Sequence, residues 1–184
     1  YAINVHGSLL PKYRGRTPHV WAIINGEKEA GITAHLMDAK VDNGEIVQQI
    51  VIPIEEHDTG AMILEKYNAQ YPILLENILK DIQNKTLKTT EQDHSKATYF
   101  GKRTPDDGQI DWDWCMERIR NWIRAQAAPY PGAFCYYKKH KITIHKATFS
   151  DFGFHADMPN GTILAVDDLS IVVKTPNGCL RLEQ

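Results

Sequence analysis

Apolar and polar positions in the first hundred residues alternate with the period of a strand in some runs and of a helix in others. The runs AGITAHLMD (30–38) and EIVQQIVIPI (45–54) change sides at every residue, so each predicts a strand with one buried face. Residues 1–6 predict a short buried strand, and HVWAIINGE (19–27) predicts a helix that ends at its Asn-Gly pair. This mixture indicates an α/β region.

A longer helical pattern follows Asp58 and Thr59, either of which can cap it. Pro72 stands inside this pattern. A proline removes one backbone hydrogen bond and crowds the preceding turn, so we expect it to kink or divide the helix. A polar stretch rich in turn residues follows the helix. The apolar residues that the pattern places on one face are Ile63, Tyr67, Leu74, Leu75, Ile78, Leu79 and Ile82.

The pattern of the last eighty residues is mostly that of short strands. One helix is predicted at 116–126, with Ile119, Trp122, Ile123 and Gln126 on one side. The change of pattern places a domain boundary near Thr104, so we expect a catalytic α/β domain over 1–104 and a small, mainly β domain over 105–184. Short runs separated by Gly, Pro, Asn and Asp predict strands at 133–137, 141–148, 162–166, 169–174 and 179–182.

Composition narrows the class of protein. The 184 residues are 42% hydrophobic, which is enough for a core and for two units. The 21 basic and 23 acidic residues nearly cancel, so no global charge attracts nucleic acid or a membrane. Cys115, Cys135 and Cys179 form no CxxC pair, which argues against a disulfide framework and a zinc site and fits a reducing cytoplasm. No apolar run is long enough for a membrane span, and we expect no signal peptide.

The first candidate for chemistry is the segment INVHGSLLPKYRGR (3–16), in which a predicted strand ends on polar residues. Side chains alternate faces along a strand, so Asn4 and His6 point to the same side, about 7 Å apart. Open α/β sheets place their reactive groups at strand ends. From the pattern alone, a catalytic pair and a pair satisfied by neighbouring loops are equally open interpretations.

The second candidate is the turn VDNGEI (41–46), which lies between the two alternating strands. Asp42 in this turn could hydrogen-bond to a histidine and hold its tautomer, as orienting carboxylates do in acid–base sites. It could also do no more than stabilise its own turn. Taken by itself, the turn favours the second interpretation.

The stretch NVHGSLLPKYRGRTPHVWAIINGEKEAGITAHLMDAKVDNGEIVQQ, with DTG at 58–60, resembles the 10-formyltetrahydrofolate-dependent formyltransferases. In that family an Asn-x-His-x-Ser-Leu-Leu-Pro segment and a downstream Asp-x-Gly turn carry catalysis. Both occur here in the family's order and approximate spacing, so the resemblance implies that Asn4, His6 and Asp42 are catalytic.

The resemblance continues through FGKRTPDDGQIDW (100–112) and PYPGAF (129–134) and covers essentially the whole chain. It implies the C-terminal part of a Rossmann-like formyltransferase domain, followed by a small, mainly β, OB-like domain. The chain opens at Tyr1 inside a predicted strand and closes in an alternating pattern. We therefore expect it to be part of a longer protein, with the first strands and parts of the folate and sugar sites before Tyr1.

Within the family, KYRGRTPHVWAIINGE, GKRTPDDG and PYPGAF most resemble sugar-nucleotide N-formyltransferases, such as those acting on UDP-4-amino-4-deoxy-arabinose and on dTDP-amino sugars. The resemblance implies transfer of the formyl group of N10-formyltetrahydrofolate to the amine of a dTDP- or UDP-linked amino sugar. We expect a cytoplasmic homodimer without a metal, serving surface polysaccharide synthesis. Methionyl-tRNA formyltransferase is one alternative, although the dispersed cations offer no basic face for tRNA. A folate- or nucleotide-binding module without turnover is another.

The resemblance also implies ligand contacts. Arg16 corresponds to the family's folate-contacting arginine. Arg103 and Arg124 could meet the diphosphate of the sugar nucleotide, but salt bridges to nearby aspartates are equally open. We expect the histidines other than His6 to be surface or structural residues. The backbone implied to hydrogen-bond the pterin ring is that of Asp38, Ala39, Lys40, Val41 and Asp42.

Overall fold

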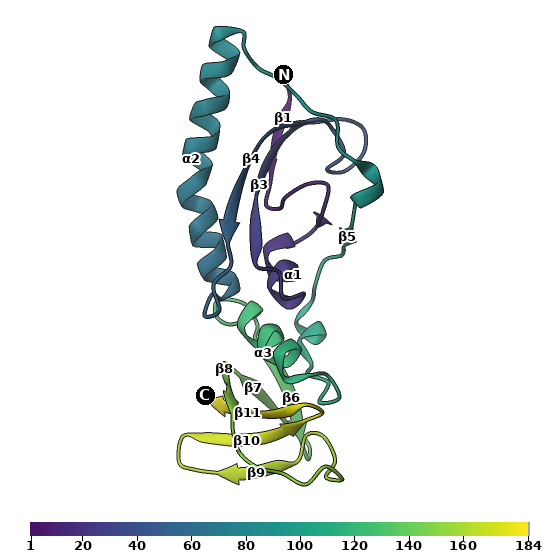
Figure 1. The fold of residues 1–184 in the computed structure, drawn as a ribbon, viewed down its shortest axis with the longest axis vertical. Helices are drawn as coiled ribbons and strands as arrows, with labels where there is room; N and C mark the ends of the chain where they lie inside the picture. Colours follow the sequence, from purple (N-terminus) through teal and green to yellow (C-terminus); the bar gives the residue numbers. More distant parts are fainter. Residues whose placement is uncertain (184) are drawn as a thin grey trace. The chain divides into compact units, whose positions relative to one another are not determined.

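The computed structural model describes residues 1–183 and shows two compact units (Figure 1). The first unit contains Tyr1–Ala22, Glu27–Asp58 and Met62–Arg103. The second contains the chain from Thr104 onward, together with Ile23–Gly26 and Thr59–Ala61. An α/β unit followed by a mainly β unit confirms the fold class expected from the sequence.

The first unit is built on a three-stranded antiparallel sheet, in the order β1 (Ile3–His6), β3 (Glu29–Leu36) and β4 (Ile46–Pro53). These strands lie where the alternating pattern predicts them. A second, two-stranded parallel sheet pairs β2 (Arg14–Gly15) with β5 (Tyr99–Phe100). No pattern predicts β2 or β5, because two residues are too few to show a period.

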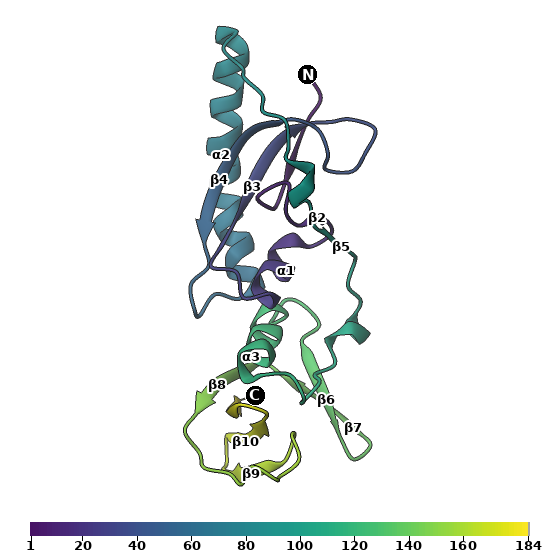
Figure 2. The same cartoon turned by 45° about the vertical axis from the view of Figure 1, so that its right-hand side comes forward.

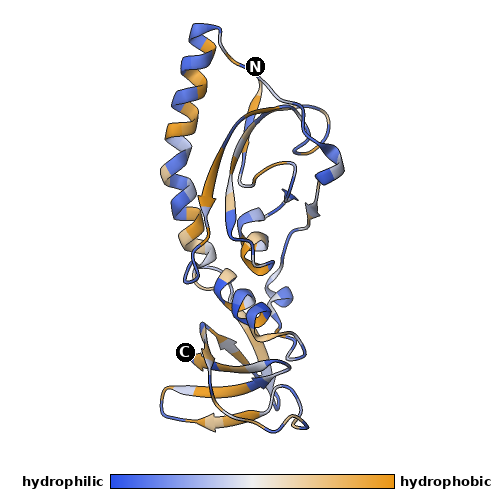
Figure 3. Cartoon of the chain, viewed as in Figure 1, coloured by the Kyte–Doolittle hydropathy of each residue, from blue (hydrophilic) through white to orange (hydrophobic). Residues whose placement is uncertain are grey.

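Two helices belong largely to the first unit: α1 (Pro18–Ile24) and α2 (Gly60–Asn84). α2 lies along the three-stranded sheet and alternates hydrophobic and hydrophilic patches, while β4 is hydrophobic over most of its length (Figures 1, 2 and 3). The core contacts of α2 come from Ile63, Tyr67, Leu74 and Ile78, which are at most 3% exposed.

The predicted apolar face of α2 is wider than its buried face, since Leu75 and Leu79 are 45% and 58% exposed. Of the two outcomes expected at Pro72, a kink or a division of the helix, the division is wrong, because one helix continues through this residue. Pro72 is exposed, and the buried residues Tyr67 and Leu74 anchor the helix on either side of it. No helix in the described part of the chain combines the length and apolarity that a membrane crossing requires.

The second unit has one helix, α3 (Met116–Ala125), and two antiparallel sheets. β6 (Ala133–Tyr137) and β7 (His140–Ile144) form a hairpin. The other sheet has the order β8 (Lys146–Ser150), β11 (Gly178–Glu183), β10 (Ser170–Thr175) and β9 (Ile163–Val166). The strand predicted at 141–148 is therefore two strands, because the chain leaves one sheet for the other at His145. Two short 3₁₀ helices, η1 (His94–Lys96) and η2 (Pro105–Gly108), precede α3.

A segment that we call the strap, residues 90–100, follows α2 and passes on the other side of the sheet (Figures 1 and 2). Thr90 exchanges two backbone hydrogen bonds with Ile46, each 2.8 Å long. Further along, the N–H of Arg14 donates to Thr98 O at 2.9 Å, and the N–H of Arg16 donates to Phe100 O at 3.0 Å. The strap thus holds the loop that follows β1.

Candidate functional site

Strand pairing places the polar residues of β1 and β3 on one face of the sheet. In the antiparallel register, Asn4 lies opposite His35 and His6 lies opposite Thr33. Opposite residues in an antiparallel pair share a face, as do residues two apart in one strand. Four polar side chains are therefore brought together by backbone geometry alone.

Thr33 anchors the loop after β1. Its hydroxyl donates to Ser8 O at 2.6 Å and accepts from the Leu10 N–H at 3.2 Å, and the side chain is fully buried. The amide of Gln49 on β4 donates to Leu10 O and to Thr33 Oγ1, at 2.9 and 2.8 Å. The Ser-Leu-Leu-Pro segment is thus held rigidly directly after His6.

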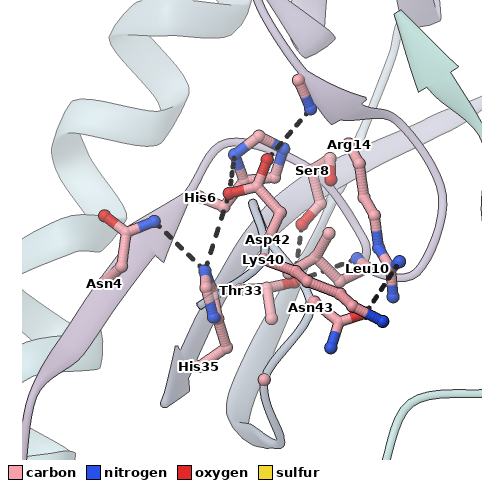
Figure 4. Close-up of polar contacts among 12 residues, drawn as sticks. Asn4, His6, Ser8, Leu10, Arg14, Thr33, His35, Lys40, Asp42 and Asn43 are labelled. Atoms are coloured by element: carbon pink, nitrogen blue, oxygen red, sulfur yellow. Dashed lines mark hydrogen bonds and ion pairs between the residues drawn. The ribbon is translucent and has the colours of Figure 1, made fainter. Parts of the chain in front are cut away.

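The turn between β3 and β4 brings Asp42 to this face (Figure 4). Asp42 has a φ of +54°, a left-handed conformation that non-glycine residues adopt rarely. The backbone at Gly44 approaches β3 so closely that a Cβ there would lie 1.9 Å from Leu36 O. A glycine is therefore required for this turn to close.

One oxygen of Asp42 faces two histidines. Its Oδ1 lies 3.5 Å from His6 Nδ1 and 3.7 Å from His35 Nε2, and its Oδ2 accepts from the Gly15 N–H at 2.9 Å (Figure 4). Asn4 joins the same cluster because its Nδ2 lies 3.1 Å from His35 Nε2. The structure thus brings Asn4, His6 and Asp42 together, with His35 between Asn4 and Asp42.

The backbone partners determine where the protons lie in this cluster. His6 Nε2 is 2.9 Å from Tyr13 O, and a carbonyl only accepts, so Nε2 carries a proton. His35 Nδ1 is 2.9 Å from Leu36 O and donates for the same reason. In neutral His35, Nε2 is then an acceptor for the Asn4 amide, whose second hydrogen is left for another acceptor. A proton on His6 Nδ1 would point at the Asp42 carboxylate.

Burial strengthens these polar contacts. His6 and Asp42 are each 8% exposed, and His35 is 3% exposed. Within residues 1–183, the ion-pair partners of Asp42 are these two histidines, with no lysine or arginine. In a site of low dielectric constant, a single carboxylate therefore acts on both rings.

Of the five residues whose backbone is implied to contact the pterin, four are exposed and Asp42 is buried. Asp38, Ala39, Lys40 and Val41 form a surface loop. Asp38 accepts from the Asn43 amide at 2.7 Å and from the Lys40 N–H at 2.8 Å, and these bonds hold the pKa of Asp38 below its ordinary value. The Lys40 N–H is therefore already engaged within the loop. The contacts of this loop with a pterin stay a prediction.

The three candidate arginines lie in different settings. Arg16 is exposed beside the cluster, with its backbone paired to the strap. Arg103 lies over the ring of Trp21 at 5.0 Å. Arg124 belongs to α3 in the second unit and donates from Nε to Asn121 at 2.8 Å. The ligand contacts implied for all three stay predictions.

Sequence reasoning missed His35, Arg14 and Gln92. The strand pattern of 30–38 contained the signal for His35, because it places that residue on the same face as Thr33, opposite β1. No pattern identified the other two residues. Arg14 is 1% exposed and Gln92 is 3% exposed, and both contact the turn of Asp42.

Two other features lie outside this cluster. A cavity of about 100 Å³ is lined by the loop after β1, α1 and Tyr67, and by none of Asn4, His6 and Asp42. On α1, burial lowers the pKa of His19 to about 4, so that ring is neutral at physiological pH. No group of three or more metal-ligating side chains occurs in the part of the chain that the structure describes.

Solved structures with this fold include several formyltransferases. An N-formyltransferase from Helicobacter canadensis, crystallised with folinic acid and dTDP-3-aminofucose, is 24% identical with a TM-score of 0.81. The sugar 3N-formyltransferase WlaRD, crystallised with dTDP and 5-N-formyl-THF, is 22% identical with the same TM-score. Both matches cover 100% of this chain, which spans 65% and 64% of theirs. A methionyl-tRNA formyltransferase from Clostridium thermocellum is 23% identical over 99% of this chain and 69% of its own, with a TM-score of 0.63.

Family models agree with the resemblance that the sequence indicated. The model for the formyl transferase domain matches residues 1–92, and the model for the formyl transferase C-terminal domain matches residues 102–184. The chain therefore belongs to the formyl transferase family.

Proposed function

We propose that this protein transfers the formyl group of N10-formyltetrahydrofolate to the amine of a nucleotide-linked amino sugar. The observation that carries the proposal is the cluster of Asn4, His6 and Asp42 in a member of the formyl transferase family. A sugar nucleotide is favoured because the two described sugar-enzyme structures share this fold with a TM-score of 0.81.

The proposed reaction is an acyl transfer between two nitrogens. The lone pair of the sugar amine forms a bond to the formyl carbon, and the C=O electron pair moves onto the formyl oxygen. When that pair returns, the bond from the formyl carbon to N10 breaks. N10 takes up one proton, and the former amine loses one. The products are tetrahydrofolate and a formamido sugar.

Asn4 is suited to stabilise the developing oxyanion. One hydrogen of its amide is engaged by His35, which orients the amide, and the second is free for the formyl oxygen. A preorganised donor of this kind contributes roughly 10²–10³ in rate. His35 therefore serves as the residue that positions Asn4.

His6 is the proposed proton carrier, and Nδ1 is the nitrogen that exchanges the proton. Nε2 is engaged by Tyr13 O at 2.9 Å, whereas the contact between Nδ1 and Asp42 is longer, at 3.5 Å. The longer contact leaves Nδ1 able to exchange a proton with the substrate. Asp42 holds the ring and stabilises its charged form, as an orienting carboxylate does.

Both ligands would bind beside this cluster. The pterin ring is flat and carries hydrogen-bonding edges, which suits the backbone of residues 38–42 and the exposed side chains of Met37 and Val41. Arg16 offers an exposed cation to the carboxylates of folate. Arg103 in the first unit stays a proposed partner of the diphosphate, and Arg124 in the second unit is a separate, alternative candidate.

We also propose the wider setting. Residues 1–104 would form the catalytic domain and 105–184 the second domain, which the change of compact unit at Thr104 supports. The second unit would supply a homodimer interface, supported by exposed apolar residues such as Val166 and Leu169. The product would serve surface polysaccharide synthesis in the cytoplasm. Sedimentation of the full-length protein at micromolar concentration tests the dimer, and a monomer would contradict it.

The activity is tested with full-length protein and N10-formyltetrahydrofolate. Tetrahydrofolate release is measured with a panel of dTDP- and UDP-linked amino sugars and, in parallel, with charged initiator tRNA. We expect turnover with at least one sugar nucleotide and none with tRNA. Turnover with tRNA alone would replace the proposal by tRNA formylation. Folate binding without transfer to any acceptor would indicate a binding module.

A further inference from the structure

Arg14 is a buried cation without a carboxylate partner. Arg14 is 1% exposed, and no Asp or Glu in residues 1–183 lies within ion-pair distance of its guanidinium. It donates instead to neutral acceptors on the strap: Tyr99 OH at 2.7 Å, Gln92 Oε1 at 2.6 Å and His94 Nδ1 at 2.9 Å. A fourth, longer contact at 3.4 Å reaches Asn43, next to Asp42 (Figure 4). A guanidinium fork suits this arrangement because it offers several donors in fixed directions.

Gln92 connects Arg14 to the turn of Asp42. Its Oε1 accepts from Arg14, and this contact determines which end of the amide faces the turn. Its Nε2 then donates to Asp42 O at 3.0 Å and to Gly44 O at 2.7 Å. Gln92 is 3% exposed, so water does not compete for these bonds. One amide from the strap thus holds the backbone of the turn on both sides of Asn43.

The turn needs such support because Asp42 is in a left-handed conformation. A non-glycine residue held in this region is strained and persists only where the surroundings over-determine it. Here the surroundings are the Gln92 amide, which holds the backbone, and the Gly15 N–H, which holds the carboxylate. Without Gln92, two buried carbonyls would also lose their donor.

We propose that Gln92, oriented by Arg14, is a positioning residue that holds the Asp42 carboxylate against His6. The proposal rests on the proposed function, because it assigns the effect on turnover to Asp42. It also has a consequence that does not depend on turnover. If the turn relaxes, the bond between the Gly15 N–H and Asp42 Oδ2 weakens.

The variant that separates positioning from stability is Gln92→Glu. The carboxylate has the same shape and still accepts from Arg14, now as an ion pair, but it cannot donate to Asp42 O or Gly44 O. We expect a fall in kcat of about 10- to 100-fold with a smaller change in KM, because small misplacements of reacting groups cost up to about 10²-fold. We also expect faster hydrogen exchange at the Gly15 amide.

Gln92→Met is the companion variant. It loses the donors to the turn, as Gln92→Glu does, and in addition it loses the contact with Arg14. We expect it to lower both kcat and the unfolding temperature, whereas Gln92→Glu lowers kcat more than stability. Gln83→Glu, at an exposed position near the end of α2, makes the same charge change and should leave both unchanged. A kcat that follows the unfolding temperature across the two Gln92 variants would overturn the proposal in favour of a purely structural role.

A double-mutant cycle tests whether Gln92 acts through Asp42. In the Asp42→Asn background, Gln92→Glu should lower kcat further by less than about twofold, because the carboxylate that it positions is already absent. If the losses in kcat of the two single variants multiply in the double variant, the proposal is overturned. Unchanged hydrogen exchange at the Gly15 amide in Gln92→Glu would also overturn it. If the wild type transfers no formyl group to any acceptor, the proposed function fails. Faster exchange at Gly15 in Gln92→Glu would then still support the positioning of Asp42.

Discussion

The strand-borne and the turn-borne parts of the site are held in different ways. Asn4, His6 and His35 are placed by the register of β1 and β3, which the backbone ladder maintains. Asp42 lies in a turn with a left-handed backbone, and side-chain bonds from Gln92 and a backbone bond from Gly15 hold it. The residues on the strands are therefore preorganised by strand pairing, while Asp42 depends on a segment fifty residues away in the chain.

The largest fall in kcat should come from replacing His6, which lies on β1. His6→Ala removes proton transfer and part of the oxyanion stabilisation together, and each is worth about 10²-fold or more, so kcat should fall by about 10⁴-fold. His6→Asn should recover only the part of kcat that comes from hydrogen bonding to the oxyanion. Folate affinity, measured by titration calorimetry, should stay near that of the wild type. A fall in kcat of less than tenfold would remove His6 from the chemistry.

Asp42→Asn tests the part of the site that lies in the turn between β3 and β4. Asparagine tolerates a left-handed backbone, so the unfolding temperature should change little. The charge that faces His6 is lost, and kcat should fall by about 10²- to 10⁴-fold. Thermal unfolding checks the expected stability, and steady-state kinetics checks the expected fall in kcat. Near-normal turnover in this variant would exclude Asp42 from the mechanism.

His35 links the two sides, and its replacement should have a moderate effect. His35→Phe removes the acceptor that orients Asn4 and should lower kcat by about 10- to 100-fold. His35→Gln keeps an acceptor at the same place on β3 and should restore part of that loss. Equal losses in both variants would show that the bond to Asn4 is not what matters at this position.

The smallest effect concerns stability away from the site. The pKa of His19 is about 4 in the folded protein, below the ordinary value of 6.5, so the unfolded state binds more protons between these values. The free energy of unfolding should therefore fall as the pH is lowered from 6.5 towards 4. His19→Gln should lessen this fall, measured by urea unfolding at several pH values. An identical pH dependence in both proteins would contradict the assignment.

The sequence already contained most of the fold of the first unit. The period-two runs at 30–38 and 45–54 became β3 and β4, and the helical pattern after residue 58 became α2. The largest error of the sequence-based prediction was the possible division of the helix at Pro72. Helix continuity there depends on Tyr67 and Leu74, which are buried on either side, and a local rule for proline cannot include them.

For the site, alternation along a strand was sufficient to place Asn4 and His6 on one face, because the period of a strand is a local property. The expectation for Asp42 came from family resemblance, since the turn by itself favoured a structural interpretation. Arg14 and Arg16 look equivalent in the sequence, as two cations in one polar loop. Only the structure buries the first and exposes the second, because the strap covers one of them.

The sequence by itself thus determined β3, β4, most of α2, the family, and the placement of Asn4 and His6 on one face of β1, all of which follow from local period or from contiguous motifs. The tertiary structure decided that His35 orients Asn4, that Asp42 faces two histidines, and that Gln92 and Arg14 hold its turn. Apart from the contact between Asp42 and His35, these contacts join residues 31 to 78 positions apart, at distances set by packing and by the need to satisfy buried polar groups. No local pattern of residues carries that information.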